Sequence, residues 1–186
     1  MTTIQPGSRA RAPASCRRSP MNLNLTGKRA LVSPPAAASA TPPRSAWPAR
    51  APRSSSAAAT RDGSRRRQKI REETGGTVEG LVADVSSADE AARLVQHAVA
   101  TLGGLDIVVH NAGGPPAGEF LSMTDAQWQK AFDQNVMSFV RLVNAAVPEM
   151  KKAGGGRILT IASSSVKQPI PGLVLSNALG PACGGS

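Results

Sequence analysis

The order of apolar and polar positions along the chain predicts four short strands. The plainest of them is residues 105–110, LDIVVH, a run rich in β-branched residues that suits a strand covered on both faces. The turn-forming sequence Asn111-Ala112-Gly113-Gly114 follows and ends it. Apolar runs predict three further strands, at residues 29–32, 77–85 and 157–162.

Two helices are predicted by apolar positions that recur every three to four residues. The first follows the capping-box pair Ser87 and Glu90, and it ends at Gly103-Gly104. The second follows the capping-box pair Thr124 and Gln127 and extends over residues 125–152. The apolar stripe predicted for this second helix consists of Trp128, Phe132, Val136, Phe139, Val143, Val147 and Met150.

One long stretch has neither pattern. Residues 34–67 are rich in Ala, Pro, Arg and Ser and show no usable period. Residues 1–68 contain twelve Arg and Lys28 against the single acid Asp62, whereas residues 69–186 hold nine basic and eleven acidic residues. The net charge of +10 therefore comes entirely from the first third of the chain. We expect a disordered basic leader at residues 1–21 and a disordered segment at residues 34–68.

Other patterns argue against several classes of protein. No run of about 18 apolar residues is present, so no transmembrane helix is expected. The first twenty residues lack the apolar core of a secretory signal, although their Arg, Ser and Ala content also fits an organellar transit peptide. Cys16 and Cys183 lie near opposite ends of the chain and predict neither a disulfide framework nor a metal site.

The sequence LDIVVHNAGG resembles the strand-four NAG motif of the short-chain dehydrogenase/reductase family. The opening MNLNLTGKRALVS and the serine run after residue 162 resemble that family in the same order, so that the resemblance covers residues 22–33 and 69–179. The pattern is similar to 3-oxoacyl-carrier-protein reductases. It implies an α/β fold with a doubly wound parallel sheet of the Rossmann type, NAD or NADP as cofactor, and a small carbonyl or alcohol substrate. It also implies a cytoplasmic protein, without metal or membrane, that forms homo-oligomers through the 125–152 helix.

The resemblance assigns five residues to the cofactor. Asp84 and Val85 match the pair that lies against the adenine ring in this family. Asn111, Ala112 and Gly113 match the turn that passes beside the cofactor ribose. From the residues alone, Asp84 is equally well explained as an acid in a turn at the end of a strand.

The resemblance also assigns the catalytic positions. Asn135 matches the Asn that kinks the long helix and holds a water in the family's proton relay, although a helix–helix hydrogen bond is the alternative. Ser163 matches the Ser that binds the substrate oxygen. Ser176 stands where the family has its acid–base Tyr, and Gly180 stands where it has the Lys that lowers the pKa of that Tyr. The chain contains no Tyr. His110, one residue before Asn111, is interpreted as a tolerated variant and not as a general base.

The chain departs from the family at both ends of the resemblance. The three glycines of the phosphate-binding turn fall at Pro34, Ala38 and Ala40, where a fixed φ or an added Cβ opposes close approach of the pyrophosphate. Strand two, strand six and strand seven cannot be identified, and residues 180–186 form an aberrant tail. The sequence therefore predicts a truncated and partial sheet, and a chain that is inactive.

Two explanations account for residues 34–67. Pro34 and Asn111 are 77 positions apart, close to the separation expected in a complete member of the family, which favours a pair of compensating frameshifts. The alternative is a genuine basic linker. Two functions from different classes follow: a short-chain oxidoreductase by ancestry, or a non-enzymatic chain whose basic segment binds nucleic acid. Trp47 is the only aromatic residue before residue 68, which weakens the second function because single-strand binders use stacking platforms.

Overall fold

The computed structural model describes residues 25–33, 55–58 and 64–184. The predicted leader at residues 1–21 lies outside the described residues. The same holds for most of the predicted segment 34–68, including Pro34, Ala38 and Ala40 of the phosphate-binding turn.

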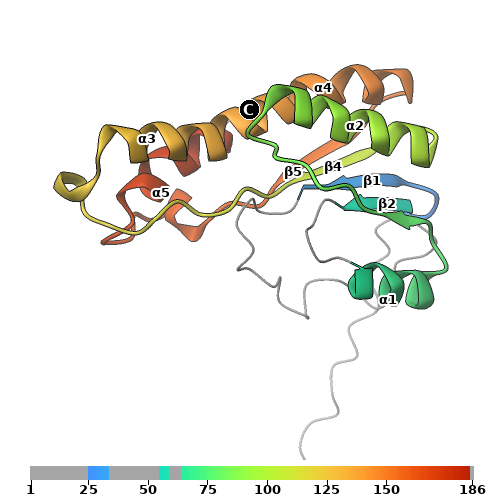
Figure 1. The fold of residues 1–186 in the computed structure, drawn as a ribbon, viewed down its shortest axis with the longest axis horizontal. Helices are drawn as coiled ribbons and strands as arrows, with labels where there is room; N and C mark the ends of the chain where they lie inside the picture. Colours follow the sequence, from blue (N-terminus) through green and yellow to red (C-terminus); the bar gives the residue numbers. More distant parts are fainter. Residues whose placement is uncertain (1–24, 34–54, 59–63, 185–186) are drawn as a thin grey trace, which may run out of the picture.

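A parallel five-stranded sheet runs through the middle of the described chain (Figure 1). Its order is β3-β2-β1-β4-β5, and every neighbouring pair is parallel. The chain thus moves outward from β1 in one direction and then returns to continue on the other side, with β1 and β4 paired at the centre. The strands are β1 Arg29–Val32, β2 Ser55–Ala58, β3 Val78–Glu79, β4 Ile107–His110 and β5 Arg157–Thr160. The α/β Rossmann-type fold class is confirmed.

Strand β2 corrects the expectation that the second strand is missing. The sequence Ser-Ser-Ala-Ala gives no strand signal, yet β2 pairs with all four residues of β1 and joins β3 to it. The reason is that a strand between two parallel neighbours is held by backbone hydrogen bonds on both sides, which do not depend on β-branched side chains. The sheet is therefore continuous from β3 to β5.

Two strands are shorter than predicted. β3 covers Val78–Glu79 instead of residues 77–85, and it pairs with Ser56 and Ala57 of β2. Because β2 ends at Ala58, the chain beyond residue 80 has no neighbour on the described sheet with which to extend the ladder. β5 ends at Thr160, two residues before the predicted end, and it forms the edge of the described sheet.

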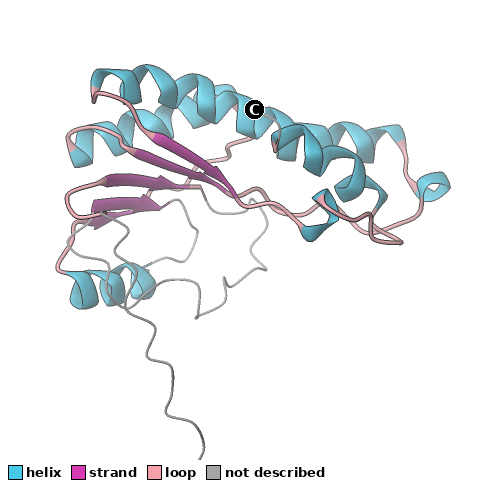
Figure 2. Ribbon diagram, turned by 180° about the vertical axis from the view of Figure 1, so that it is seen from behind, coloured by secondary structure: helices cyan, strands magenta, loops and turns pink. Residues whose placement is uncertain are grey.

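The described helices lie on both faces of the sheet. α2 (Ala88–Leu102) and α4 (Ser138–Lys152) pack together over one face, whereas α1 (Ser64–Thr74) lies on the other side (Figures 1 and 2). The core between α2, α4 and the central strands contains Leu31, Val85, Leu94, Val95, Ala98, Leu105, Val108, Leu142, Ala146 and Met150. The remaining elements, which gather toward one end of the molecule, are α3 (Asp125–Phe132), α5 (Val174–Leu179) and the 3₁₀ turns Phe120–Ser122, Ser164–Val166 and Gly180–Cys183.

The two predicted capping boxes have different outcomes. At α3 the Thr124 hydroxyl accepts from the Gln127 N–H and the Gln127 side chain accepts from the Thr124 N–H, so that box is confirmed. At α2 the box is wrong: Ser87 is the N-cap, but its side chain makes no capping bond. Glu90 accepts from the Arg93 guanidinium instead, because that ion pair on the next turn competes for its carboxylate. Gly103 ends α2 in a left-handed conformation, as predicted.

The long helix at residues 125–152 has the predicted extent but contains a wider turn. α3 leads into a π-helical segment, Asp133–Met137, which leads into α4. The predicted apolar stripe is mostly wrong, because only Met150 of it is buried. The buried residues of this stretch are instead Ala131 of α3 and Ser138, Leu142 and Ala146 of α4, and α4 packs against α2 and β4. Val136, Phe139, Val143 and Val147 lie beside them and are half-buried.

None of the helices described at residues 64–184 combines the length and the apolar character that crossing a bilayer requires.

Candidate functional site

A pocket of about 220 Å³ opens where the chain leaves the carboxyl ends of β4 and β5. This is the edge of a parallel sheet at which ligands bind in open α/β folds. Five of the predicted site residues line it: Asn111, Ala112, Asn135, Ser163 and Ser176. They come from four separate segments of the chain, so the fold gathers what the sequence holds apart.

Asn135 reaches the pocket from the π-helical segment. In this segment the N–H of Ser138 donates to the carbonyl of Asp133, five residues back, which widens the turn that carries Asn135. The Asn135 side chain donates from Nδ2 to the carbonyl oxygen of Ala131, at 2.9 Å. The helix therefore has a π turn where the kink is expected, and the Asn135 side chain bonds to the backbone of the preceding turn; the kink itself stays a prediction.

The backbone carbonyl of Asn135 is partly occupied. The thiol of Cys183, which is buried and also lines the pocket, donates to this oxygen at 3.5 Å. Burial raises the pKa of the Cys183 thiol, so the group is a neutral donor at pH 7. Sequence reasoning treated Cys183 as part of an aberrant tail and missed this contact, which no local pattern signals.

The serine run after β5 forms a small network. Ser163 is exposed at the pocket, and its Oγ accepts from the N–H of Ser165 as the cap of a 3₁₀ turn. Ser165 is buried, and its Oγ lies 2.9 Å from the Oγ of Ser176. The residue at the family's Tyr position is thus tied to the serine loop. Ser165 was missed because a serine run after a strand usually indicates only a loop.

Gly180, at the family's Lys position, also lines the pocket. A Cβ added there would lie 3.1 Å from Cγ2 of Val166, so a larger residue needs a small shift of that side chain.

His110 ends β4 and is 2 % exposed. Its Nε2 lies 3.0 Å from Oγ of Ser138, and its ring meets Phe139 edge-on at 5.4 Å. Burial lowers the pKa of His110 to about 4, so the ring is neutral at pH 7. A base this weak is unsuited to proton abstraction at neutral pH, and the interpretation that His110 is not a general base stays a prediction.

Three predicted cofactor residues do not line the pocket. Val85 is buried in the core, and Gly113 lies just beyond the lining. Asp84 is exposed and accepts from both the N–H and the hydroxyl of Ser86, at 2.9 and 2.6 Å. These bonds, led by the one from the Ser86 hydroxyl, lower the pKa of Asp84. Its geometry in the described chain is that of a turn acid, and its role toward adenine stays a prediction.

The polar groups near the pocket bear on whether the nicotinamide half of a dinucleotide fits there. Two buried polar atoms at the carboxyl ends of the central strands have no partner among the described residues, Oγ of Ser33 and Nδ1 of His110. Ser33 follows β1 directly, and its N–H donates to Val109 of β4. His110, Asn111 and Asn135 line the pocket, and their polar groups are of the kind that bind a ribose or a nicotinamide amide, whereas Ser33 is fully buried and does not line it.

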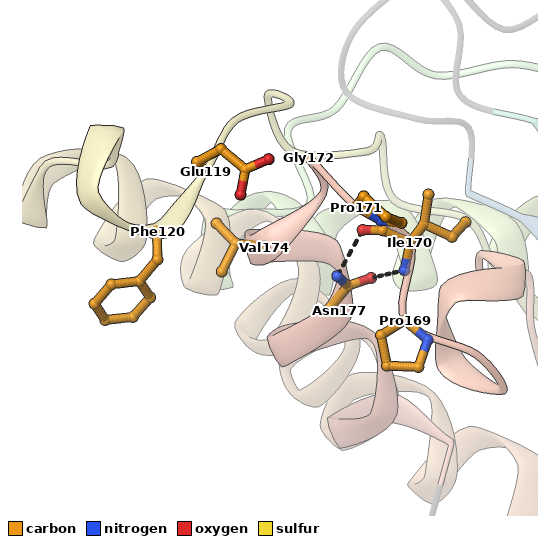
Figure 3. Close-up of a pocket in the computed structure, with 8 residues that line it drawn as sticks. All are labelled: Glu119, Phe120, Pro169, Ile170, Pro171, Gly172, Val174 and Asn177. Carbon is orange, nitrogen blue, oxygen red and sulfur yellow. Dashed lines mark hydrogen bonds between the residues drawn. The ribbon is translucent and has the colours of Figure 1, made fainter.

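A second pocket of about 300 Å³ lies in the neighbouring loops. The side-chain amide of Asn177 forms two hydrogen bonds with the backbone of Ile170 (Figure 3): it accepts from the N–H at 3.0 Å and donates to the carbonyl at 2.9 Å. Glu119 and Phe120 line its other side. None of the predicted site residues lies in this pocket. Across the described chain, no three His, Cys, Asp or Glu side chains come together as a metal ligand set would require.

Comparison with known proteins gives one consistent family. The sequence profile described as short chain dehydrogenase matches residues 55–178. The uncharacterized oxidoreductase YvrD of Bacillus subtilis (strain 168) is 40% identical over 99 residues, which are 53% of this chain and 37% of that protein. The chain therefore matches little more than a third of the length of this curated relative.

Solved structures agree with the sequence comparison. A 7α-hydroxysteroid dehydrogenase complexed with NADH and 7-oxo glycochenodeoxycholic acid matches with a TM-score of 0.62 and 30% identity, over 70% of this chain and 51% of that chain. An NADPH-bound short chain oxidoreductase from Pseudomonas aeruginosa PAO1, described as containing an atypical catalytic center, matches with a TM-score of 0.63 and 26% identity, over 69% of this chain and 51% of that chain.

Proposed function

The chain belongs to the short chain dehydrogenase family, and from this we propose that it binds the nicotinamide end of NAD or NADP but lacks the acid–base pair for efficient hydride transfer. Members of this family bind NADH or NADPH in solved structures. The family acts on small molecules, and the substrate proposed for this chain is a carbonyl or the corresponding alcohol.

The observation that carries the proposal is the convergence of Asn111, Asn135, Ser163 and Ser176 on one pocket at the carboxyl ends of β4 and β5. The sequence resemblance assigns these four positions to cofactor and substrate. Their separation in sequence makes a chance gathering at a ligand-binding edge improbable.

The bound cofactor would supply or accept the hydride, and the chain's own residues would orient the reactants. Asn111 and Ala112, which line the pocket, would lie beside the ribose. The Ser163 hydroxyl accepts a bond from the Ser165 N–H and keeps its own hydrogen for a substrate oxygen.

The proton for that oxygen is the missing element. A serine hydroxyl is a far weaker acid than a phenol, and the Ser176 hydroxyl is already engaged with Ser165 at 2.9 Å. With Gly180 in place of a Lys, no cation at this position lowers the pKa of a donor. We therefore infer little or no turnover by this chain.

Cofactor binding is the first test. NADH and NADPH are titrated into the purified chain, with nicotinamide fluorescence and protection against thermal unfolding as measurements. Ser163→Trp should weaken binding at least about tenfold, because the exposed Ser163 lets a large side chain enter the pocket mouth. Lys167→Trp, in the same loop but outside the pocket, is the matched control. Equal cofactor affinity in both variants would show that the cofactor does not bind in this pocket.

Restoring the acid–base pair is the second test. The double variant Ser176→Tyr/Gly180→Lys should reduce an acetoacetyl thioester faster than Ser176→Phe/Gly180→Lys by about 10²-fold or more, the usual contribution of a general acid. The two differ only in the phenolic hydroxyl. Equal rates would contradict the assignment of position 176.

Four finer points form part of the proposal. Similarity to 3-oxoacyl-carrier-protein reductases makes a 3-oxoacyl thioester the first substrate to try. We place the chain in the cytoplasm and expect a homo-oligomer through the exposed side of α4, where Phe139 and Val143 are half-buried. Frameshifting also stays a proposal.

The proposed out-of-frame stretch narrows to residues 34–54. Strand β2 and the profile match both begin at residue 55, which supports an in-frame sequence from that point onward. Translation of the encoding DNA in three frames across codons 30–70 tests this. A glycine-rich turn in another frame would support it, and normal codon usage in the present frame would favour a genuine linker.

A further inference from the structure

A chain of hydrogen bonds joins the end of β4 to the π-helical segment. Nε2 of His110 lies 3.0 Å from Oγ of Ser138, the first residue of α4. The Ser138 hydroxyl in turn donates to the carbonyl of Gln134 at 2.6 Å, with Asn135 O as a longer second acceptor at 3.3 Å. His110 and Ser138 are buried, so water does not compete for these bonds.

The direction of these bonds fixes the state of the histidine. A hydroxyl has one hydrogen, and Ser138 uses it toward the backbone of the π segment. Ser138 can therefore only accept from His110, which places the ring hydrogen on Nε2. The neutral ring then leaves Nδ1 as a bare acceptor, the atom that has no partner among the described residues.

The hydrogen bond between His110 and Ser138 stabilises the position of the π-helical segment. Its wide turn replaces the regular α-helical bonds, and π turns of this kind occur mostly as single-turn bulges at functional sites. Asn135 supports the turn from within through Ala131, on the same helix. The bond from His110 is the described side-chain contact that connects this turn to the sheet.

We propose that His110 is a positioning residue: acting through Ser138, it holds the π-helical segment to the end of β4 and so fixes where Asn135 lies in the pocket. The importance of this clamp for catalysis rests on the oxidoreductase function proposed above, whereas the clamp itself is a property of the unliganded chain. This role goes beyond the interpretation of His110 as a tolerated variant.

The histidine state can be measured directly. Long-range ¹H–¹⁵N spectra of the histidine-labelled full chain, which has only two histidines, should show His110 with its hydrogen on Nε2. His97→Gln assigns the two sets of signals. In Ser138→Ala the Nε2 signal should move, because its acceptor is gone, and in Asn144→Ala, an exposed change on the same helix, it should not. A hydrogen on Nδ1 in the parent chain would overturn the proposal.

The clamp is tested by hydrogen exchange at the amides of residues 134–137. His110→Phe keeps a ring against Phe139 but removes the donor, so a role in packing alone predicts no change. We expect exchange to rise about tenfold in both His110→Phe and Ser138→Ala, the size that one lost hydrogen bond allows, and to stay unchanged in Asn144→Ala. Exchange within twofold of the parent chain in both variants would overturn the clamp.

The link to the cofactor has a separate measurement. If the parent chain binds NADH, His110→Phe and Ser138→Ala should both weaken it relative to Asn144→Ala, and unchanged affinity would refute a role in the site. If the parent chain does not bind NADH or NADPH, the proposed function fails. The exchange experiment still decides the clamp, since it needs no ligand.

Discussion

Replacing Asp106 by Asn should destabilise the sheet at its centre. Asp106 directly precedes β4, and its carboxylate accepts three bonds from Arg29, the first residue of β1: from the backbone N–H at 2.8 Å, from Nε at 2.7 Å and from Nη2 at 3.1 Å. The Arg29 guanidinium also donates to the carbonyl of Gly103 at the end of α2. One ion pair thus joins two strands and a helix end.

The size of this destabilisation depends on how far the Arg29–Asp106 pair is buried from solvent. The side chains of Arg29 and Asp106 are 26% and 13% exposed, so the pair is neither a solvated surface bridge, worth about 0–1 kcal/mol, nor a fully desolvated one. Asparagine can still accept from the Arg29 N–H but loses the charge. Hydrogen bonds to charged groups contribute about 1.5–3 kcal/mol, and we expect Asp106→Asn to lower the free energy of unfolding by about 2 kcal/mol at pH 7.

The effect of pH gives an independent check. Bonds from the Arg29 side chain are the main cause that lowers the pKa of Asp106 in the folded chain below its ordinary value of 3.8. The stabilisation is therefore present above pH 4 and is lost as the pH falls through the lowered folded-state pKa. In Asp106→Asn this part of the acid destabilisation should be absent.

Urea unfolding followed by circular dichroism measures both effects, provided that the slope with urea is the same in each variant. Glu119→Gln, which removes one exposed carboxylate from a loop, is the control for net charge. A loss below about 0.5 kcal/mol, or the same acid profile in parent and Asp106→Asn, would refute the reasoning, because an exposed pair would behave in that way.

Three further changes have definite expected outcomes. Folding lowers the pKa of His110 from 6.5 to about 4, so the unfolded chain binds this proton more readily and the free energy of unfolding should fall by about 3 kcal/mol between pH 6.5 and pH 4. In urea unfolding, His110→Asn should lack this dependence of the free energy on pH, and an equal dependence in both chains would contradict the assignment. Thr124→Ala should cost about 1 kcal/mol in the same assay because it breaks a formed capping box, whereas Ser87→Ala should cost much less, and equal losses would show that the two caps do not differ. Leu159 on the edge strand β5 is 52% exposed, and exposed apolar edge strands favour aggregation. Leu159→Lys should therefore reduce aggregation of the purified chain, measured by light scattering, and unchanged scattering would mean that chains do not associate through β5.

Local sequence signals predicted the elements that depend on local interactions. The bounds of β1, the cap at Thr124 and the end of α2 at Gly103 agree with expectation, because apolar runs, capping pairs and glycines act within a few residues. Strand β2 could not be predicted in this way. Its Ser-Ser-Ala-Ala sequence is compatible with many structures, and its two neighbours in the sheet decide that it is a strand.

The prediction of which residues of the long helix are buried was wrong for a related reason. The pattern placed the largest apolar residues, such as Phe139, toward the core, but the buried positions of α4 include the small residues Ser138, which meets His110 of β4, and Ala146, which packs in the core with α2. The half-buried row beside them belongs to the side of α4 through which the homo-oligomer is proposed to form.

The candidate site was predicted in its outline and not in its connections. Spacing relative to a known family identified Asn135, Ser163 and Ser176 as residues of one site, and they do share a pocket. The bonds that hold them come from partners that no short-range pattern marks. Ser138 lies 28 residues from His110, and a single buried serine at the start of a helix resembles any other.

The π-helical segment also bears on how the chain tolerates insertions and deletions. A helix rotates by about 100° per residue, so the loss of one residue within α4 would turn the faces on its two sides out of register. A π turn already holds one residue more than an α turn. Loss of one residue between Asp133 and Met137 would convert this turn into regular helix, and both ends could keep the faces that they now present to the sheet. In an alignment of related chains, single-residue gaps in this helix should therefore fall in these five positions, and the chains that carry such a gap should lack the bulge that presents Asn135.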